Sequence, residues 1–428
     1  MQPWFQKLKS VFPSENHKRF LWNSIAVSFS KAFSSICNLA FMVLAVNILS
    51  KVENGFFQYY FSIIPVLLAI AEFGIPQALI RFLAPKTESI SESSKILQAS
   101  IWAKGTGLFL LLLIGVIYFF FQNESIYFIF LLVLGAFISS FFSYFEAILV
   151  SYRKYNYLAI WNPLPNISRL ATLVYFVVFQ KDQLTYESIL AIYSLSPLFS
   201  FTTFFIFSNA MGLLWREKGS FPKENYKTLI QFNIWAFSAS LFAIVSDRLE
   251  IFLLKKFHSP VVVAEYGTSL QLFSGFVIIL ATLSSLVLPK LSRLADKPEF
   301  KKALLQSILL GASIAIVLSP GWFLGGIILD ILFAGKYNNS IHSFQILYPN
   351  YLLQLVFAPM GMALFALNQP KLLALLAFLR LVFGLLFDFM FIPEYGSTGA
   401  ATSQFLGQIV SWLVLLGYFS AIFRTKET

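Results

Sequence analysis

Four basic side chains fall inside long apolar runs of the sequence, where a charge is costly: Lys31, Arg169, Arg248 and Arg380. An ionisable group at membrane depth should face a partner or a watery cavity. Arginine stays charged and grips oxyanions with a planar fork of donors, so these residues are expected to line a cavity that binds an anion. Two simpler interpretations stay open, in which Lys31 snorkels to the surface and the arginines form structural ion pairs.

Acidic side chains lie in the same apolar runs: Glu72, Glu146, Asp247, Glu250 and Asp388. They could balance the basic residues, or one of them could exchange a proton or a sodium ion. The ion-coupling candidates are Glu72, Asp247, Glu250 and Asp388. Glu72 is preferred, because Gly74 and Pro76 follow it and can bend the helix and free carbonyl groups around it.

Amide side chains also recur within the apolar runs, including Asn38, Gln58, Gln354, Gln404 and Gln408. They could hydrogen-bond sugars or hold neighbouring helices together, and both interpretations remain open. Cys37 is the only cysteine, and the three histidines are scattered along the chain. We therefore expect no disulfide, no metal site and no cofactor. The chain has no Walker motif for ATP hydrolysis.

The composition places these side chains in a membrane protein. Of 428 residues, 58% are hydrophobic and 12% are charged. Apolar runs of about 20 residues, the length that crosses a bilayer as a helix, predict an all-α integral membrane protein with twelve transmembrane helices. The expected spans are 22–49, 56–80, 97–121, 125–150, 158–180, 186–211, 229–254, 262–288, 303–333, 341–367, 371–391 and 397–423. The ninth contains Pro320 and Gly321, which predict a kink.

The basic residues predict the orientation. With a cytoplasmic amino terminus, 22 basic residues, including Lys95 and Lys104, fall on the cytoplasmic side and five on the other, which places both termini in the cytoplasm. The net charge of +11 then reflects orientation and not nucleic-acid binding. Residues 1–21 are expected to form a cytoplasmic interfacial segment.

A weak internal repeat divides the chain. Shifting the sequence by 209 positions lays Arg81 on Lys290, so the second and eighth spans both exit through a basic residue. The repeat predicts two six-helix lobes around a central cavity, at 22–211 and 229–428, joined by a cytoplasmic linker at 212–228. Arg81 and Lys290 are then expected to form a cytoplasmic gate.

Several motifs occur in an order that resembles one known family. They are LSKVENGFFQYY, AEFGIPQALIRFLA, SDRLEIFLL, AEYGTSL, LVLPKLSRL, LFAGKYNNS and IPEYGSTGAATSQ. The chain resembles the polysaccharide biosynthesis flippases, relatives of O-antigen exporters in the multidrug and oligosaccharidyl-lipid exporter superfamily. The resemblance implies alternating access and movement of undecaprenyl-pyrophosphate-linked oligosaccharides to the outer leaflet of the bacterial cytoplasmic membrane. Its implied partners are the membrane lipids, H⁺ or Na⁺, and a polymerase or glycosyltransferases.

Two other functions compete with this one. A cation-coupled multidrug exporter of the same superfamily would favour an acidic cavity, whereas the residues expected nearest the middle of their spans, Arg169 and Arg380, are basic. A membrane-embedded polymerase or glycosyltransferase would need a large outer loop or a cytoplasmic domain. The connections between the expected spans are too short for either, so we expect a transporter and not an enzyme.

Overall fold

The computed structural model describes residues 14–87, 89–121, 126–180, 183–200, 223–294 and 298–425. In the first half these residues form α2 (Ser14–Ile48), α3 (Lys51–Glu72), α4 (Ile75–Leu83), the short helix η1 (Ala84–Lys86), α5 (Ile90–Phe121), α6 (Ile126–Ser151), α7 (Tyr155–Trp161), α8 (Leu164–Phe179) and α9 (Tyr186–Leu195). In the second half they form α11 (Lys223–Ser246), α12 (Leu249–Phe257), α13 (Pro260–Leu272), α14 (Ser274–Leu294), α15 (Phe300–Leu318), α16 (Gly321–Phe333), α17 (Ser340–Ala366) and α18 (Pro370–Thr425).

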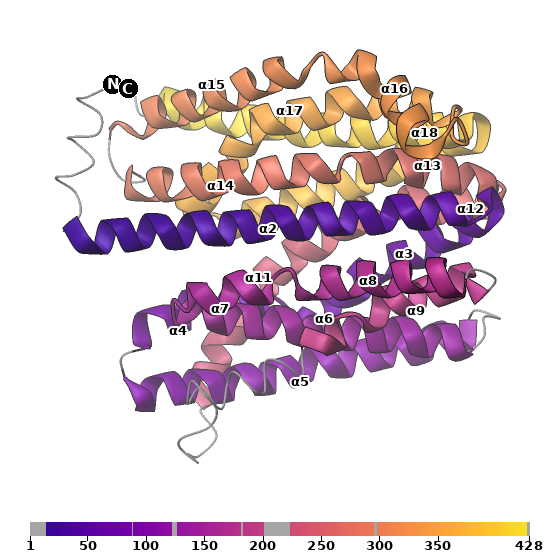
Figure 1. Cartoon of the computed structure of the whole chain (residues 1–428). Coiled ribbons are helices and arrows are strands. Elements are labelled where there is room, and N and C mark those ends of the chain that lie inside the picture. Colours follow the sequence, from indigo (N-terminus) through magenta and orange to yellow (C-terminus); the bar gives the residue numbers. More distant parts are fainter. Residues whose placement is uncertain are drawn as a thin grey trace.

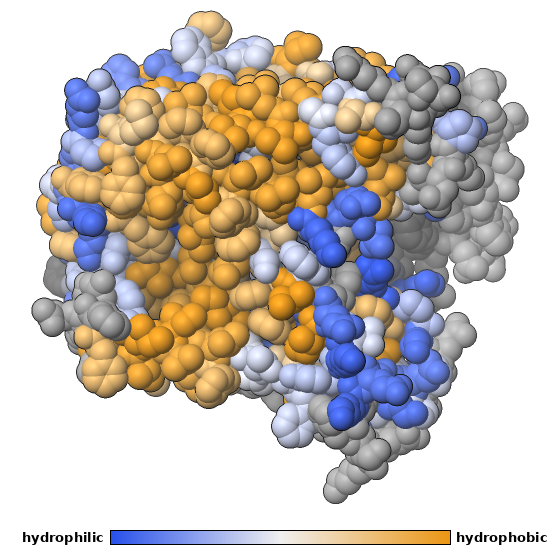
Figure 2. Space-filling model, turned by 180° about the vertical axis from the view of Figure 1, so that it is seen from behind, coloured by the Kyte–Doolittle hydropathy of each residue, from blue (hydrophilic) through white to orange (hydrophobic). Residues whose placement is uncertain are grey.

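The helices have the length and composition of membrane spans. Nine helical stretches in the described residues are long and apolar enough to cross a membrane, and α16 is a shorter apolar helix. Hydrophobic residues cover a broad band across the middle of the face in Figure 2, and hydrophilic residues gather towards its ends. The expected all-helical membrane protein is therefore confirmed. The expected interfacial segment lies mostly outside the described residues, as does the second half of the sixth span.

Several spans are broken into two helices. Between α3 and α4, Phe73 and Gly74 both take left-handed conformations, with φ of 49° and 70°. The ninth span is interrupted between α15 and α16, next to Pro320. Both breaks occur where glycine and proline predicted a bend. Within α18, Gly396 has a non-helical conformation and separates the two expected final spans.

The break between α11 and α12 was not predicted from the sequence. The α11 helix ends at Ser246 and α12 begins at Leu249, so Asp247 and Arg248 stand at the interruption. The sequence places no glycine or proline there. Most of the expected linker at 212–228 lies outside the described residues, and its residues 223–228 are helical as the first part of α11.

The two halves of the sequence pack against each other. Figure 1 shows α5 to α9 on one side of the molecule and α13 to α18 on the other, with α2 running between them. The closest packing across this boundary brings α3 against α13. Gly55 of α3 has no room for a side chain, because a Cβ there would lie 1.9 Å from the Pro260 carbonyl oxygen. Glycine therefore permits the close approach of the two halves.

Polar contacts join the halves at the end of the molecule where α2 finishes. Asn54 of α3 donates to Thr268 of α13 at 3.2 Å and to the Tyr337 hydroxyl at 2.9 Å. The Lys336 ammonium donates to the Val46 carbonyl at 2.8 Å and also to the Leu49 carbonyl. Val46 lies in the last turn of α2 and Leu49 directly follows the helix, where the helix itself supplies no donor.

Lys104 lies at a different place from the one predicted from the sequence. It was counted among the basic residues of the cytoplasmic side, but it lies within α5 with 3% of its surface exposed. Its ammonium donates to the Ala71 carbonyl at 3.3 Å and to the Ser140 carbonyl at 2.9 Å. Lys104 therefore stabilises the end of α3, directly before the break at Gly74.

Candidate functional site

Two adjoining cavities lie between the two halves of the chain. The first has a volume of about 660 Å³ and the second of about 700 Å³. Asn38 of α2 and Ser274 and Val277 of α14 line both, so the cavities share a wall. Each is bounded by helices from both halves of the sequence. All four predicted cavity cations line these cavities, together with two acids: Lys31, Arg169 and Glu146 line the second cavity, and Arg248, Arg380 and Asp247 line the first.

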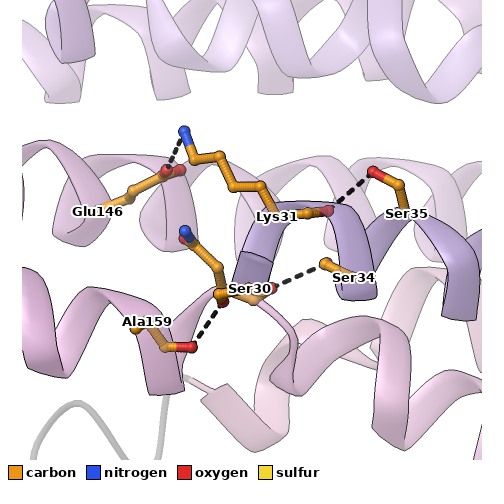
Figure 3. A network of polar contacts seen from close by, with 7 residues as sticks. Ser30, Lys31, Ser34, Ser35, Glu146 and Ala159 are labelled. Atoms are coloured by element: carbon orange, nitrogen blue, oxygen red, sulfur yellow. Dashed lines mark hydrogen bonds and ion pairs between the residues drawn. The ribbon is translucent and has the colours of Figure 1, made fainter. Parts of the chain in front are cut away.

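Lys31 lines the second cavity and is paired with an acid. Its ammonium lies 3.6 Å from the Glu146 carboxylate, and 57% of the lysine side chain is exposed. Figure 3 shows the Lys31 side chain reaching from α2 towards Glu146 on α6. An exposed pair at this distance contributes little stability, so the lysine remains available to a ligand. Both the cavity location and the pairing with an acid are therefore present.

Arg169 lines the second cavity but is held by neutral groups. The residue is 5% exposed and donates to Asn38 at 2.9 Å, Asn166 at 2.8 Å and Ser196 at 3.1 Å. Its guanidinium carbon lies 3.6 Å from the centre of the Tyr193 ring. Within the described residues it has no ion pair, so its positive charge is uncompensated by a nearby carboxylate at this wall. The alternative of a structural ion pair is thus not seen for Arg169 among the described residues.

Arg380 lines the first cavity and forms an ion pair. Its guanidinium lies 2.5 Å from the Asp247 carboxylate, and the arginine side chain is 12% exposed. Asp247 is more accessible, with 48% of its side chain exposed, and it also lines the cavity. The alternatives drawn from the sequence are therefore both realised, because Arg380 is a cavity residue and a member of a pair.

Arg248 is the cavity cation with unused donors. It follows Asp247 at the break between α11 and α12 and lines the first cavity. Its guanidinium carbon lies 5.9 Å from the centre of the Phe61 ring on α3. Among the described residues it makes no side-chain hydrogen bond or ion pair. A guanidinium has five N–H donors, so Arg248 can bind an anion without first losing a protein partner.

The preferred coupling acid, Glu72, lies behind the second cavity. It is the last residue of α3 and interacts electrostatically with Lys104 and Glu146 and with the Ser143 hydroxyl. Ser143 and Glu146 line the second cavity, whereas Glu72 does not. Glu72 therefore connects the buried Lys104 with the charged residues of the cavity wall.

Glu250 and Asp388 form a second acidic group. They are 3% and 1% exposed, and they are close enough to interact electrostatically. Among the described residues, both Asp388 carboxylate oxygens and one Glu250 oxygen are buried without a close hydrogen-bond partner, although the Ser403 hydroxyl interacts with Asp388. Two adjacent buried carboxylates repel each other, so the group favours a shared proton or a bound cation. No cluster of three or more metal-binding side chains occurs in the part of the chain that the structure describes.

The expected gate residues lie away from both cavities. Arg81 is exposed in the last turn of α4. Lys290 is exposed on α14 and donates to Gln306 at 3.1 Å. Neither residue lines the first or the second cavity.

Asn166 and Ser196, which accept hydrogen bonds from Arg169, were not predicted as site residues. Nothing in the local sequence distinguishes them from other polar residues.

Comparison with known proteins identifies the family. The family model described as "Polysaccharide biosynthesis protein" matches residues 20–295, which is more than half of the chain. The chain belongs to this family. The resemblance seen in its ordered motifs is therefore confirmed.

Individual relatives agree with this assignment. The chain is 28% identical over 214 residues to a Shigella flexneri protein named "Putative O-antigen transporter", a match that covers 48% of this chain and only half of that protein. It is 21% identical over 412 residues to an uncharacterised membrane protein of Methanocaldococcus jannaschii, covering 89% of this chain and 80% of the relative.

Solved structures establish the fold. The lipid II flippase MurJ in an inward closed conformation gives a TM-score of 0.67 at 14% identity, covering 92% of this chain and 87% of MurJ. An inward-facing multidrug resistance transporter of the MATE family gives 0.70 at 13% identity, covering 92% of this chain and 96% of that transporter. At this identity the likeness concerns the fold alone, and the chain has the fold shared by MurJ and MATE transporters.

Proposed function

We propose that this polysaccharide biosynthesis protein is a flippase for polyprenyl-pyrophosphate-linked oligosaccharides in the bacterial cytoplasmic membrane. The observation that carries the proposal is Arg248, whose unused donors face a cavity between the two halves of the chain. Pyrophosphate oxygens fit a guanidinium with free donors. Lys31 and Arg169 add positive charge in the adjoining cavity. The polyprenyl tail would stay in the lipid while the headgroup occupies the cavities.

The transport cycle in this proposal is alternating access between two six-helix lobes, built from twelve spans with both termini in the cytoplasm. Asn54 and Lys336 join the two halves at the end of α2 opposite Ser14, and in this proposal their contacts keep that side closed. Opening there requires these contacts to break while the opposite end closes. No covalent chemistry is needed, because moving the headgroup requires only a change in which side is exposed.

A bound ion would give the cycle its direction. A substrate that binds both conformational states equally well does not shift the equilibrium between them. A second ligand with different affinities for the two states is therefore needed. The Glu250 and Asp388 group, with buried carboxylate oxygens that lack a close hydrogen-bond partner among the described residues, supports a proton or sodium site near the Asp247–Arg380 pair. Glu72 remains a second coupling candidate, supported by its electrostatic interaction with Lys104.

The test uses the full chain in liposomes that contain a polyprenyl-pyrophosphate-linked disaccharide with a fluorescent label on the sugar. A membrane-impermeant quencher added outside reports how fast labelled headgroups exchange between leaflets. The proposal predicts faster exchange than in protein-free liposomes. An unchanged exchange rate, together with proton- or sodium-dependent uptake of a fluorescent organic cation, would instead support the multidrug exporter.

A further inference from the structure

We infer that the first cavity contains a sugar-binding subsite formed by Gln354, Gln408 and Trp412, next to the anion-binding Arg248. The inference rests on the proposed function and specifies which part of the substrate this cavity recognises. It also assigns a role to amide side chains that the sequence left open between sugar binding and helix packing.

One face of α18 carries the first part of the subsite. Gln404, Gln408 and Trp412 follow one another at four-residue spacing and all line the first cavity. Residues four apart lie on the same side of a helix, so the two amides and the indole form a continuous strip. Gln404 is held in place because its amide oxygen accepts a hydrogen bond from the Tyr266 hydroxyl at 3.3 Å.

The second part of the subsite comes from α17. Tyr351, Gln354, Ala358 and Gly361 occur at three- and four-residue spacing and line the same cavity. A Cβ built on Gly361 would meet no atom within 4 Å, so the cavity is open at this position. The amide of Gln354 therefore stands beside unoccupied space of the cavity.

The amides of Gln354 and Gln408 are unused. In the described part of the chain, neither forms a side-chain hydrogen bond, whereas Gln58 donates to Asn54 at 3.2 Å and so serves helix packing. An amide that lines a largely apolar cavity gains free energy when a ligand supplies its partners. Each free amide offers two donors and an acceptor, which match hydroxyl groups that both donate and accept.

Aromatic rings give the same cavity flat apolar surfaces. Tyr351 stacks on Phe273 with ring centres 4.2 Å apart and planes inclined by 6°, and Trp412 stacks on Phe357 at 5.0 Å. Stacking fixes the orientation of these side chains. A sugar presents hydroxyl groups at its edge and C–H groups on its face. The cavity therefore offers amides for the edge of a sugar and aromatic surface for its face.

The net charge of this wall favours a sugar attached to an anion over an organic cation. Arg248 and Arg380 outnumber the one acid that lines the cavity, Asp247, which Arg380 already neutralises. Arg248 and the free amides line one cavity of about 660 Å³, large enough for one or two sugar rings beside a pyrophosphate. The subsite thus places sugar recognition directly beside phosphate recognition.

The test measures binding to the purified full-length protein in lipid nanodiscs. The probes are farnesyl pyrophosphate, which has no sugar, and farnesyl pyrophosphate linked to glucose, galactose, rhamnose or N-acetylglucosamine. We expect at least one sugar-bearing probe to bind more tightly than farnesyl pyrophosphate. Gln354→Leu and Gln408→Leu should each lower the binding affinity for that probe by about tenfold. Both variants should bind farnesyl pyrophosphate with the affinity of the unaltered protein.

Two controls separate the subsite from general damage. Gln369→Leu replaces an exposed glutamine outside both cavities and should bind every probe as the unaltered protein does. Gly361→Leu fills the open space of the cavity and should exclude the sugar-bearing probes, whereas Gly417→Leu, at an exposed position on α18 with no atom within 4 Å, should not. A Gln408→Asn variant, which keeps the amide, tests the site if the leucine variants fail to fold.

The outcomes distinguish this inference from the proposed function. Binding of farnesyl pyrophosphate without any gain from a sugar would overturn the sugar subsite and leave the flippase proposal in place. A sugar-dependent gain that survives Gln354→Leu, Gln408→Leu and Gly361→Leu would also overturn the subsite. Failure of the unaltered protein to bind any of the pyrophosphate probes would count against the proposed function itself.

Discussion

Arg380 and Asp247 lie 2.5 Å apart although 133 positions separate them in the chain. The pair joins α18 to the break between α11 and α12, and it leaves the neighbouring Arg248 without a carboxylate partner among the described residues. The pairing of Asp247 with one arginine thus determines which arginine remains available at the cavity. This relationship is the structural basis of the proposed anion site.

The Arg380–Asp247 pair should be visible as coupling between two substitutions. Arg380→Met leaves the Asp247 carboxylate without its partner and should lower the free energy of unfolding by about 1–3 kcal/mol. The double variant Arg380→Met, Asp247→Asn should lose less than the sum of the two single variants. Unfolding measured in detergent checks this prediction, and strictly additive losses would show that the pair contributes no interaction free energy.

Replacing the buried acids Asp388 and Glu250 should change how flipping depends on an ion gradient. Asp388→Asn and Glu250→Gln remove the charge from a buried group that would exchange a proton or sodium ion. We expect both variants to lose stimulation of flipping by an imposed proton or sodium gradient while still binding farnesyl pyrophosphate. If flipping by these variants still responds to the gradient as in the unaltered protein, the coupling site lies elsewhere. Glu72→Gln is then the next variant to measure.

The buried lysine of α5 predicts a loss of stability. Lys104→Met removes the donor to the Ala71 and Ser140 carbonyls and leaves Glu72 without its nearby positive charge. The free energy of unfolding should fall by about 2–3 kcal/mol, as for other lost hydrogen bonds of a buried charged group. Lys95→Met, an exposed position on the same helix, is the matched control. Equal stability of the two variants would refute the role assigned to Lys104.

The contact of Lys336 with α2 predicts a shift between conformations. Lys336→Met removes the donor to the Val46 and Leu49 carbonyls, where the two halves meet at the end of α2. Hydrogen–deuterium exchange should then increase in residues 45–50 and 334–340. Lys256→Met changes an exposed lysine and should leave this exchange unchanged. Unaltered exchange in the Lys336 variant would show that the contact does not hold this end closed.

Local signals made much of the fold predictable. Long apolar runs located the helices, because a span needs about 20 apolar residues whatever its neighbours are. Gly74 and Pro320 marked two of the breaks, since glycine and proline change the backbone directly. The break at Asp247 and Arg248 carries no such residue, and its position depends on packing between distant helices.

The candidate site was predictable in its residue types and less so in its pairings. Buried charge alone singled out Arg169, Arg248 and Arg380, because such residues are costly in a membrane. Their partners come from helices far apart in the sequence, as with Arg169 and Asn38 at 2.9 Å. Lys104 was misplaced because its position near the start of an apolar run resembles that of an orientation charge.

The central claim is that Arg248 binds the pyrophosphate of a lipid-linked glycan during transport. The most direct measurement compares flipping of the labelled pyrophosphate-linked disaccharide by the unaltered protein, Arg248→Gln and Arg293→Gln, the last an exposed arginine outside both cavities. Because Arg248→Gln loses charged hydrogen bonds to the pyrophosphate, its flipping rate should fall by about 10- to 100-fold when equal amounts of protein are inserted in the membrane. The flipping rate of Arg293→Gln should be unchanged. Flipping by Arg248→Gln at the rate of the unaltered protein would contradict the account.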